Sequence, residues 1–114
     1  MYINARVKGR VMRVLSDEAK AWEKDIIYHA RAWKGRTGWS EQEKKTIVRL
    51  WFFWPDQRRR DTHNTLKLLL DGLVKAGIYT DDKLALPQVM DYEIDRHRPR
   101  VEIEFEVTEH VDAG

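Results

Sequence analysis

The chain has 114 residues, no cysteine, and 21 Lys and Arg against 19 Asp and Glu. This length allows one hydrophobic core, so we expect a single domain over residues 1–114. Without cysteine the chain has no disulfide and no thiolate metal site, which suits a reducing compartment. The dense apolar run 50–54 is too short to span a bilayer and the first residues do not resemble a signal peptide. We therefore expect a cytoplasmic protein.

The first predicted elements are a strand and a helix. Residues 9–15 place apolar side chains among basic ones and weakly favour a strand. Ser16 is a good N-cap, and apolar residues recur at helical spacing over the residues that follow it. These features predict an amphipathic helix over residues 17–33, ended by Gly35.

A loop and a buried strand come next. Ser40 with Glu43 resembles a capping box and predicts a short helical turn. Trp39, in the same basic loop, is the tryptophan that best suits a nucleic-acid contact, whereas the others suit a core. Residues 46–54 are rich in branched and aromatic side chains, which predicts a largely buried strand.

A second helix is the clearest predicted element. Its apolar face consists of Leu66, Leu69, Leu70, Leu73 and Val74, and Gly77 follows its end. Beside this face, Asn64, Lys67 and Asp71 fall at i, i+3 and i+7. They form a polar stripe with one amide, one cation and one carboxylate.

The remaining residues predict β-structure. An acidic turn over residues 80–83 precedes a strand over residues 86–95, and a basic turn leads into a final hairpin. In residues 101–107 glutamates alternate strictly with apolar residues, which predicts a strand with one face in water. Together the elements predict an α+β fold, with two main helices packed on a mixed three- to four-stranded sheet.

Charged residues cluster around the start of the second helix. The run Arg58, Arg59, Arg60 stands directly before Asp61, and Asp81 and Asp82 follow the helix. Hydrolysis of a phosphodiester needs cations that hold the backbone and carboxylates that hold a divalent metal ion. Taken separately, each feature has a simpler interpretation: the arginines as a solvated face, Asp61 or Thr62 as an N-cap, and the Asp pair as a turn. Asp71 could likewise be an ion-pair partner of Lys67.

Residues 54–82 resemble the central block of RusA-type Holliday-junction endonucleases. That block reads approximately R-R-R-D-x-D-N-x-x-K, followed by a leucine-rich helix with an Asp, then A-G and a D-D pair. A weaker resemblance runs from Gly9 to Trp22, which is similar to the first basic loop and helix of the family. The family's first strand and its Pro-Pro-Ser-x-Asn segment have no counterpart in residues 1–114, so we expect that strand to be absent. Resolvases of this kind are often carried by prophages.

The resemblance implies a role for each matching position. Catalytic roles fall to Asp61, Lys67 and Asp82, metal binding to Asp61, His63 and Asp82, support of the site to Asn64, Asp71 and Asp81, and DNA binding to Arg58, Arg59, Arg60, Lys8 and Arg10. The implied cofactor is Mg²⁺, which prefers hard oxygen ligands. His63 stands where the family has a second Asp, and its imidazole favours Mn²⁺ or later transition metals. It is a metal ligand, a proton-transfer group or a bystander, in that order of preference.

The implied function is a structure-selective, metal-dependent DNA endonuclease that resolves four-way junctions by paired nicks in recombination and repair. Paired nicks at symmetric positions require two active sites, which a homodimer supplies. One alternative is a module that binds branched DNA but cuts poorly because of His63 or the absent strand. A more remote alternative is a protein-interaction domain that has no role on DNA.

Overall fold

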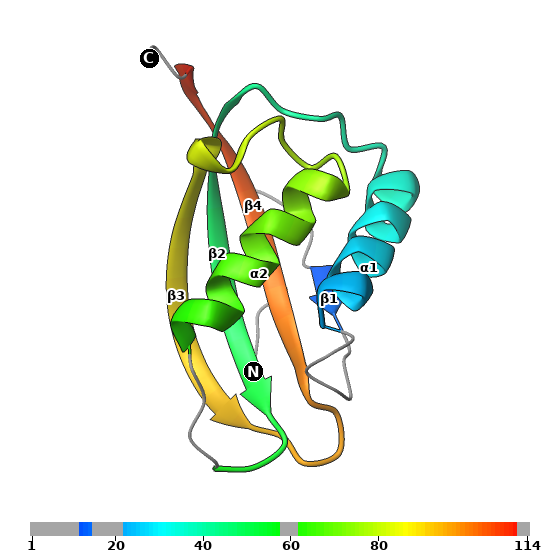
Figure 1. Ribbon diagram of the computed structural model, residues 1–114, viewed down its shortest axis with the longest axis vertical. Coiled ribbons are helices and arrows are strands. Elements are labelled where there is room, and N and C mark those ends of the chain that lie inside the picture. Colours follow the sequence, from blue (N-terminus) through cyan, green and yellow to red (C-terminus); the bar gives the residue numbers. More distant parts are fainter. Residues whose placement is uncertain (1–11, 15–21, 58–61, 112–114) are drawn as a thin grey trace.

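The computed structural model describes residues 12–14, 22–57 and 62–111. In chain order the elements are β1 (Met12–Val14), α1 (Trp22–Thr37), β2 (Lys44–Trp54), α2 (Thr62–Lys75), the short 3₁₀ helix η2 (Asp82–Leu84), β3 (Ala85–Ile94) and β4 (Arg100–Val111). The described strands form a four-stranded sheet in the order β1-β4-β2-β3. Strands β2 and β3 are parallel, whereas β4 is antiparallel to β1 and β2. Both helices cover one face of this sheet (Figure 1), which confirms the predicted α+β fold.

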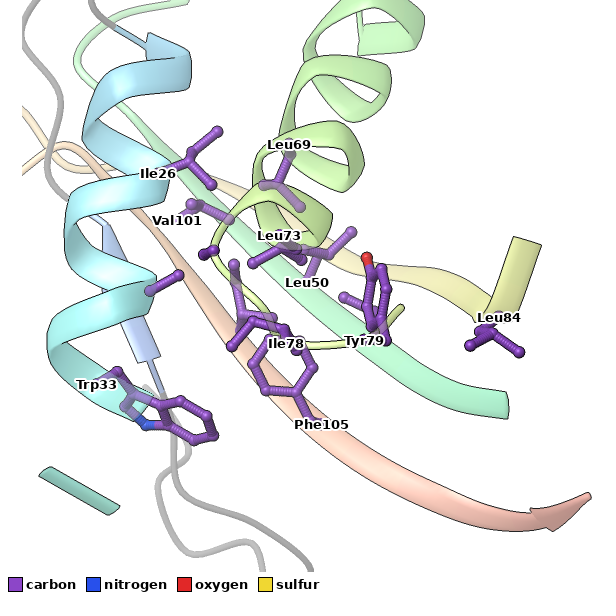
Figure 2. Packing of buried hydrophobic residues seen from close by; sticks show 14 of the residues in the cluster. Ile26, Trp33, Leu50, Leu69, Leu73, Ile78, Tyr79, Leu84, Val101 and Phe105 are labelled. Atoms are coloured by element: carbon purple, nitrogen blue, oxygen red, sulfur yellow. The ribbon is translucent and has the colours of Figure 1, made fainter. Parts of the chain in front are cut away.

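The core lies between the two helices and the sheet (Figure 2). It contains Ile26, Ala30 and Trp33 of α1, Leu69 and Leu73 of α2, Val48, Leu50 and Phe52 of β2, and Val101, Ile103 and Phe105 of β4. The helical residues are spaced three or four apart and the strand residues two apart, so each element turns one apolar face inward. Burying one such large side chain stabilises the fold by about 1.5–3 kcal/mol. The second helix and the buried strand over residues 46–54 are therefore confirmed.

Helix α1 ends later than predicted. It continues through Gly35 to Thr37, and the left-handed residue that follows is Gly38, with φ of 71°. The N–H of Gly38 donates to the carbonyl of Lys34 at 3.0 Å, and the Thr37 hydroxyl donates to the carbonyl of Trp33 at 2.8 Å. A glycine in the last turns of a helix was thus mistaken for the glycine that ends it. The predicted beginning of this helix, from residue 17 to residue 21, lies outside the described residues.

The predicted helical turn at Ser40 and Glu43 is wrong. Gln42 instead forms an isolated parallel bridge with Tyr79. Its N–H donates to the carbonyl of Ile78, and its carbonyl accepts from the N–H of Thr80, each at 3.0 Å. The segment before β2 is therefore extended, and these hydrogen bonds join it to the residues that follow α2.

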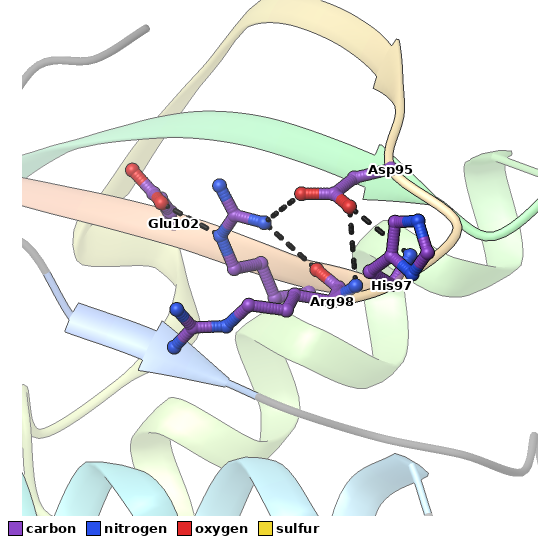
Figure 3. Close-up of polar contacts among 5 residues, drawn as sticks. Asp95, His97, Arg98 and Glu102 are labelled. Atoms are coloured by element: carbon purple, nitrogen blue, oxygen red, sulfur yellow. Dashed lines mark hydrogen bonds and ion pairs between the residues drawn. The ribbon is translucent and has the colours of Figure 1, made fainter.

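The predicted final hairpin is also wrong, because β2 lies between β3 and β4. Their connection passes the end of β2, where the N–H of Asp95 donates to the carbonyl of Trp54 at 2.8 Å. Arg100 stabilises this connection through hydrogen bonds (Figure 3). Its guanidinium donates to the carboxylates of Asp95 and Glu102, both at 2.8 Å, and to the carbonyl of Arg98 at 2.7 Å. Its guanidinium also lies 3.9 Å from the centre of the Phe53 ring.

The glutamates of β4 do not face open water. Glu102 and Glu104 are only 2% and 1% exposed, because β4 is an inner strand and arginines cover their carboxylates. Arg49 of β2 donates to Glu104 at 3.1 Å and to Glu106 at 2.7 Å. Alternation of charged and apolar residues correctly predicted the strand, but the prediction of one wet face is wrong.

Gly72 lets α1 and α2 approach each other closely. A Cβ atom at this position would lie 2.8 Å from Cγ2 of the buried Ile26, whereas one at Gly35 would meet nothing within 4 Å. We expect Gly72→Ala to lower the free energy of unfolding by about 1–3 kcal/mol, because overpacking outweighs the gain in helix propensity. Gly35→Ala should raise it by roughly 0.5–1 kcal/mol. Urea denaturation of both variants checks this, and a shift of the same sign in both would contradict it.

Candidate functional site

The end of α2 positions the acidic turn. Gly77, with φ of 81°, donates its N–H to the carbonyl of Val74, and Ile78 donates to the carbonyl of Leu73, each at 3.0 Å. This is the paired hydrogen bonding of a Schellman motif, in which glycine takes the left-handed position without steric cost. Leu73 and Ile78 are both buried, so the chain leaves the helix in a fixed direction. The predicted role of Gly77 is confirmed.

The acidic turn itself is well ordered by local hydrogen bonds. Asp81 is the N-cap of η2: its carboxylate accepts from the N–H of Lys83 at 3.0 Å and its carbonyl from the N–H of Leu84 at 3.1 Å. Leu84 is buried and anchors the turn in the core. Asp82 and Asp81 are both exposed. Asp81 therefore has the simple turn-forming role considered above, and it also presents Asp82 to solvent.

The charges of two other carboxylates act on Asp82 at this turn. The pKa of Asp82 is raised above its ordinary value, first by a hydrogen bond with Asp81, then by desolvation, and then by the negative charges of Asp81 and Asp71. Asp71 comes from α2, so helix and turn converge here. Like charges held close together favour a proton or a cation between them. The turn is thus an acidic part of the described surface.

The polar stripe of α2 is arranged as the sequence predicted. Asn64 and Lys67 are exposed, and Asp71 is half-buried. All three side chains are described, and no ion pair joins Lys67 to Asp71. The charge of Asp71 acts instead on Asp82 and on Tyr79. Its interpretation as a simple surface partner of Lys67 is not supported.

Several predicted site residues lie outside the described residues: Asp61, Arg58, Arg59, Arg60, Lys8 and Arg10. His63 belongs to the first turn of α2, but its side chain is not described either. Among the residues whose side chains the structure describes, no group of three or more His, Asp or Glu is arranged to hold a metal ion. The ligand set of Asp61, His63 and Asp82 therefore stays a prediction, of which the described part contributes Asp82.

Tyr79 is a residue of this site that sequence reasoning missed. Its side chain is fully buried, and its hydroxyl has no hydrogen-bond partner in the described part of the chain. The pKa of the phenol is raised, chiefly by burial and further by the charges of Asp82 and Asp71. A tyrosine between an isoleucine and a threonine carries no recognisable signal, so its burial and the effect of the two carboxylates on it follow only from the fold.

Trp39 has a structural role, and its contact with nucleic acid stays a prediction. Its indole N–H donates to the carbonyl of Ile78 at 2.9 Å. The ring packs against Trp33 and Phe105, with centroids 5.3 and 5.4 Å apart. It is only partly exposed and is held by the core.

These features define a small α+β domain in which two helices cover a mixed four-stranded sheet and an acidic turn follows the second helix. A family model described as Endodeoxyribonuclease RusA matches residues 3–106, and the chain belongs to this family. It is 43% identical over 47 residues to proteins named crossover junction endodeoxyribonuclease RusA from Escherichia coli (strain K12) and Shigella sonnei (strain Ss046). That similarity covers 41% of this chain and 36% of each relative.

No helix in the described ranges is both long and apolar enough to cross a membrane.

Proposed function

We propose that the protein is a divalent-metal-dependent DNA endonuclease that acts in the cytoplasm and resolves four-way junctions. Family membership across residues 3–106 supports nuclease chemistry. The observation that carries the proposal is the placement of the exposed Asp82 in the turn after α2, where the charges of Asp81 and Asp71 act on it. The family motif assigns these three positions to metal binding and its support. The relatives named as crossover junction endonucleases support branched DNA as the substrate.

The donor set fits a hard divalent cation. Asp61, His63 and Asp82 would hold the ion, with Asp71 and Asp81 supplying further negative charge. Carboxylate oxygens suit Mg²⁺, while the imidazole makes Mn²⁺ an equal or better fit. When bound, the ion would activate water and neutralise charge that develops on the phosphate.

Lys67 and the arginines have separate roles in this proposal. Lys67 is exposed on α2, one turn before Asp71, and would stabilise the phosphate as it becomes more negative in the transition state. Asn64, on the same stripe, would support the site. The arginines at positions 58–60, with Lys8 and Arg10, would dock the DNA backbone through phosphate contacts.

A homodimer completes the proposal. Resolution of a four-way junction needs two nicks at symmetric positions, and a two-fold axis places two equal active sites accordingly. Each protomer would then contribute one acidic site and one set of arginines.

A nicking assay tests the proposed activity. The protein is incubated with a synthetic four-way junction, and with a linear duplex of the same sequence, in Mg²⁺ or Mn²⁺. We expect metal-dependent paired nicks in the junction alone. Tight, salt-sensitive binding to the junction without cleavage in either metal would favour the alternative, a branched-DNA-binding module, for which the replacement of an acidic ligand by His63 gives a reason.

Arg58, Arg59 and Arg60 should contact phosphates and not bases. Replacing two of them by Ala removes up to two phosphate contacts and the counterion release that accompanies each. We expect weaker binding to junctions of every sequence and a slope of log affinity against log salt that is smaller by about one to two units. Fluorescence anisotropy at several salt concentrations measures this slope. Altered sequence preference at an unchanged slope would indicate base recognition instead.

A further inference from the structure

The turn between β3 and β4 carries cations that no acidic side chain neutralises. Arg96, His97 and Arg98 are all exposed. Within the part of the chain that the structure describes, neither of these two arginines has a side-chain ion pair or hydrogen bond, whereas Arg49 and Arg100 each pair with two carboxylates. Cations held close together repel one another, so such a surface favours a ligand that brings negative charge.

The backbone of this turn is held in one conformation. The N–H groups of His97 and Arg98 donate to the carboxylate of Asp95 at 3.2 and 3.1 Å, as in an Asx turn. The guanidinium of Arg100 closes the turn by donating to Asp95 and to the carbonyl of Arg98. Pro99 restricts the backbone further. The exposed side chains therefore extend from a fixed base, and less conformational entropy is lost when they bind a ligand.

The carboxylate of the turn is already engaged within the fold. Asp95 pairs with Arg100 at 2.8 Å, and its pKa is lowered, first by this hydrogen bond and then by the one from the N–H of Arg98. Figure 3 marks no interaction with the guanidinium of Arg98. The negative charge of Asp95 is thus directed at Arg100, and Arg96 and Arg98 keep their charges for an external partner.

The turn is also well placed for contact with a large ligand. In Figure 1 it lies at the lower end of the longest axis, beyond both helices, so neither α1 nor α2 shields it. A guanidinium group presents several N–H donors in one plane and binds phosphate oxygens in pairs. The polyanion that family membership associates with this chain is DNA.

We propose that the turn over residues 96–98 is a further DNA-docking element, in which Arg96 and Arg98 bind backbone phosphates of the junction. It acts in addition to the basic residues assigned above. This inference rests on the proposed function on branched DNA, but it does not depend on the metal site. The contacts carry no sequence information, because the phosphate is common to every nucleotide.

Arg96→Gln combined with Arg98→Gln tests this role. Fluorescence anisotropy with a labelled four-way junction, at several salt concentrations and without divalent metal, measures binding by the full chain. We expect weaker binding and a slope of log affinity against log salt that is smaller by about one to two units, because each phosphate contact contributes about 0.9. The unfolding midpoint should equal that of the wild type, since neither guanidinium has a partner among the described residues.

Two further double variants complete the experiment. Arg96→Lys with Arg98→Lys should restore most of the slope, because lysine also neutralises a phosphate; if it does not, the arginines contact bases and the proposal is overturned. Lys24→Gln with Arg36→Gln is the matched control, which removes two exposed charges from α1 and should leave the slope unchanged. An equal loss in this control would assign the effect to total charge and also overturn the proposal.

The outcomes separate this inference from the proposed function. Wild-type affinity and slope in the variant with glutamine at positions 96 and 98 overturn the docking role, while cleavage of the junction by the wild-type protein leaves the proposed function standing. If the wild-type protein neither binds nor cuts the junction, the proposed function and this inference fail together.

Discussion

Asp82→Asn should abolish cleavage of a four-way junction and leave binding to the junction intact or tighter. The substitution keeps the size of the side chain but removes one negative ligand from the proposed metal site. DNA binding should not suffer, because no cation is lost and repulsion of the phosphates is reduced. Single-turnover cleavage in Mg²⁺ and junction binding in Ca²⁺ measure the two quantities separately.

Glu93→Gln is the matched control for Asp82→Asn. Glu93 is an exposed carboxylate near the far end of β3 from η2, so the change in charge is the same and the site is not altered. Its cleavage rate should equal that of the wild type. Wild-type cleavage by Asp82→Asn would show that Asp82 is not a ligand and would remove the structural basis of the proposed function.

The sequence predicted those elements whose hydrophobic period is long and uninterrupted. The leucines of α2 and the branched and aromatic residues of β2 each bury a face that their spacing already indicated. Helix ends were harder, because Gly35 can be accommodated inside a helix while Gly38 ends it. Sheet order was harder still: adjacent strands in sequence suggested a hairpin, but the pairing of β2 with both β3 and β4 is a long-range property.

For the candidate site too, some features could be predicted from the sequence and others could not. The motif spacing predicts Asp71, Asp81 and Asp82 as members of one site, and in the structure the charges of Asp71 and Asp81 act on Asp82. The burial of Tyr79, whose hydroxyl has no hydrogen-bond partner among the described residues, could not be found from the sequence, because it depends on what the fold packs around the ring. A strand position tells which side a residue faces, but it does not tell what covers that side. For this reason the glutamates of β4 were wrongly predicted to face water.

The buried pairing of Arg49 with Glu104 should contribute strongly to stability. Arg49→Met keeps much of the aliphatic stem but removes the guanidinium that pairs with a carboxylate only 1% exposed. Leaving a buried charge without its counter-ion is strongly destabilising, so we expect the free energy of unfolding to fall by about 3–5 kcal/mol. Guanidinium chloride denaturation, with the unfolding midpoint and slope both fitted, measures the change.

Two further variants separate the buried charge from a simple loss of packing. Lys44→Met breaks an exposed pair with Glu109, whose side chain is 93% exposed, and should cost less than about 1 kcal/mol. Adding Glu104→Gln to Arg49→Met removes the uncompensated charge and should recover part of the lost stability. If the double variant is no more stable than Arg49→Met alone, the cost comes from packing of the arginine stem against the sheet. Recovery would instead establish that the alternating glutamates of β4 are tolerated in the sheet because arginines neutralise them, which is why the charge pattern failed to mark a wet face.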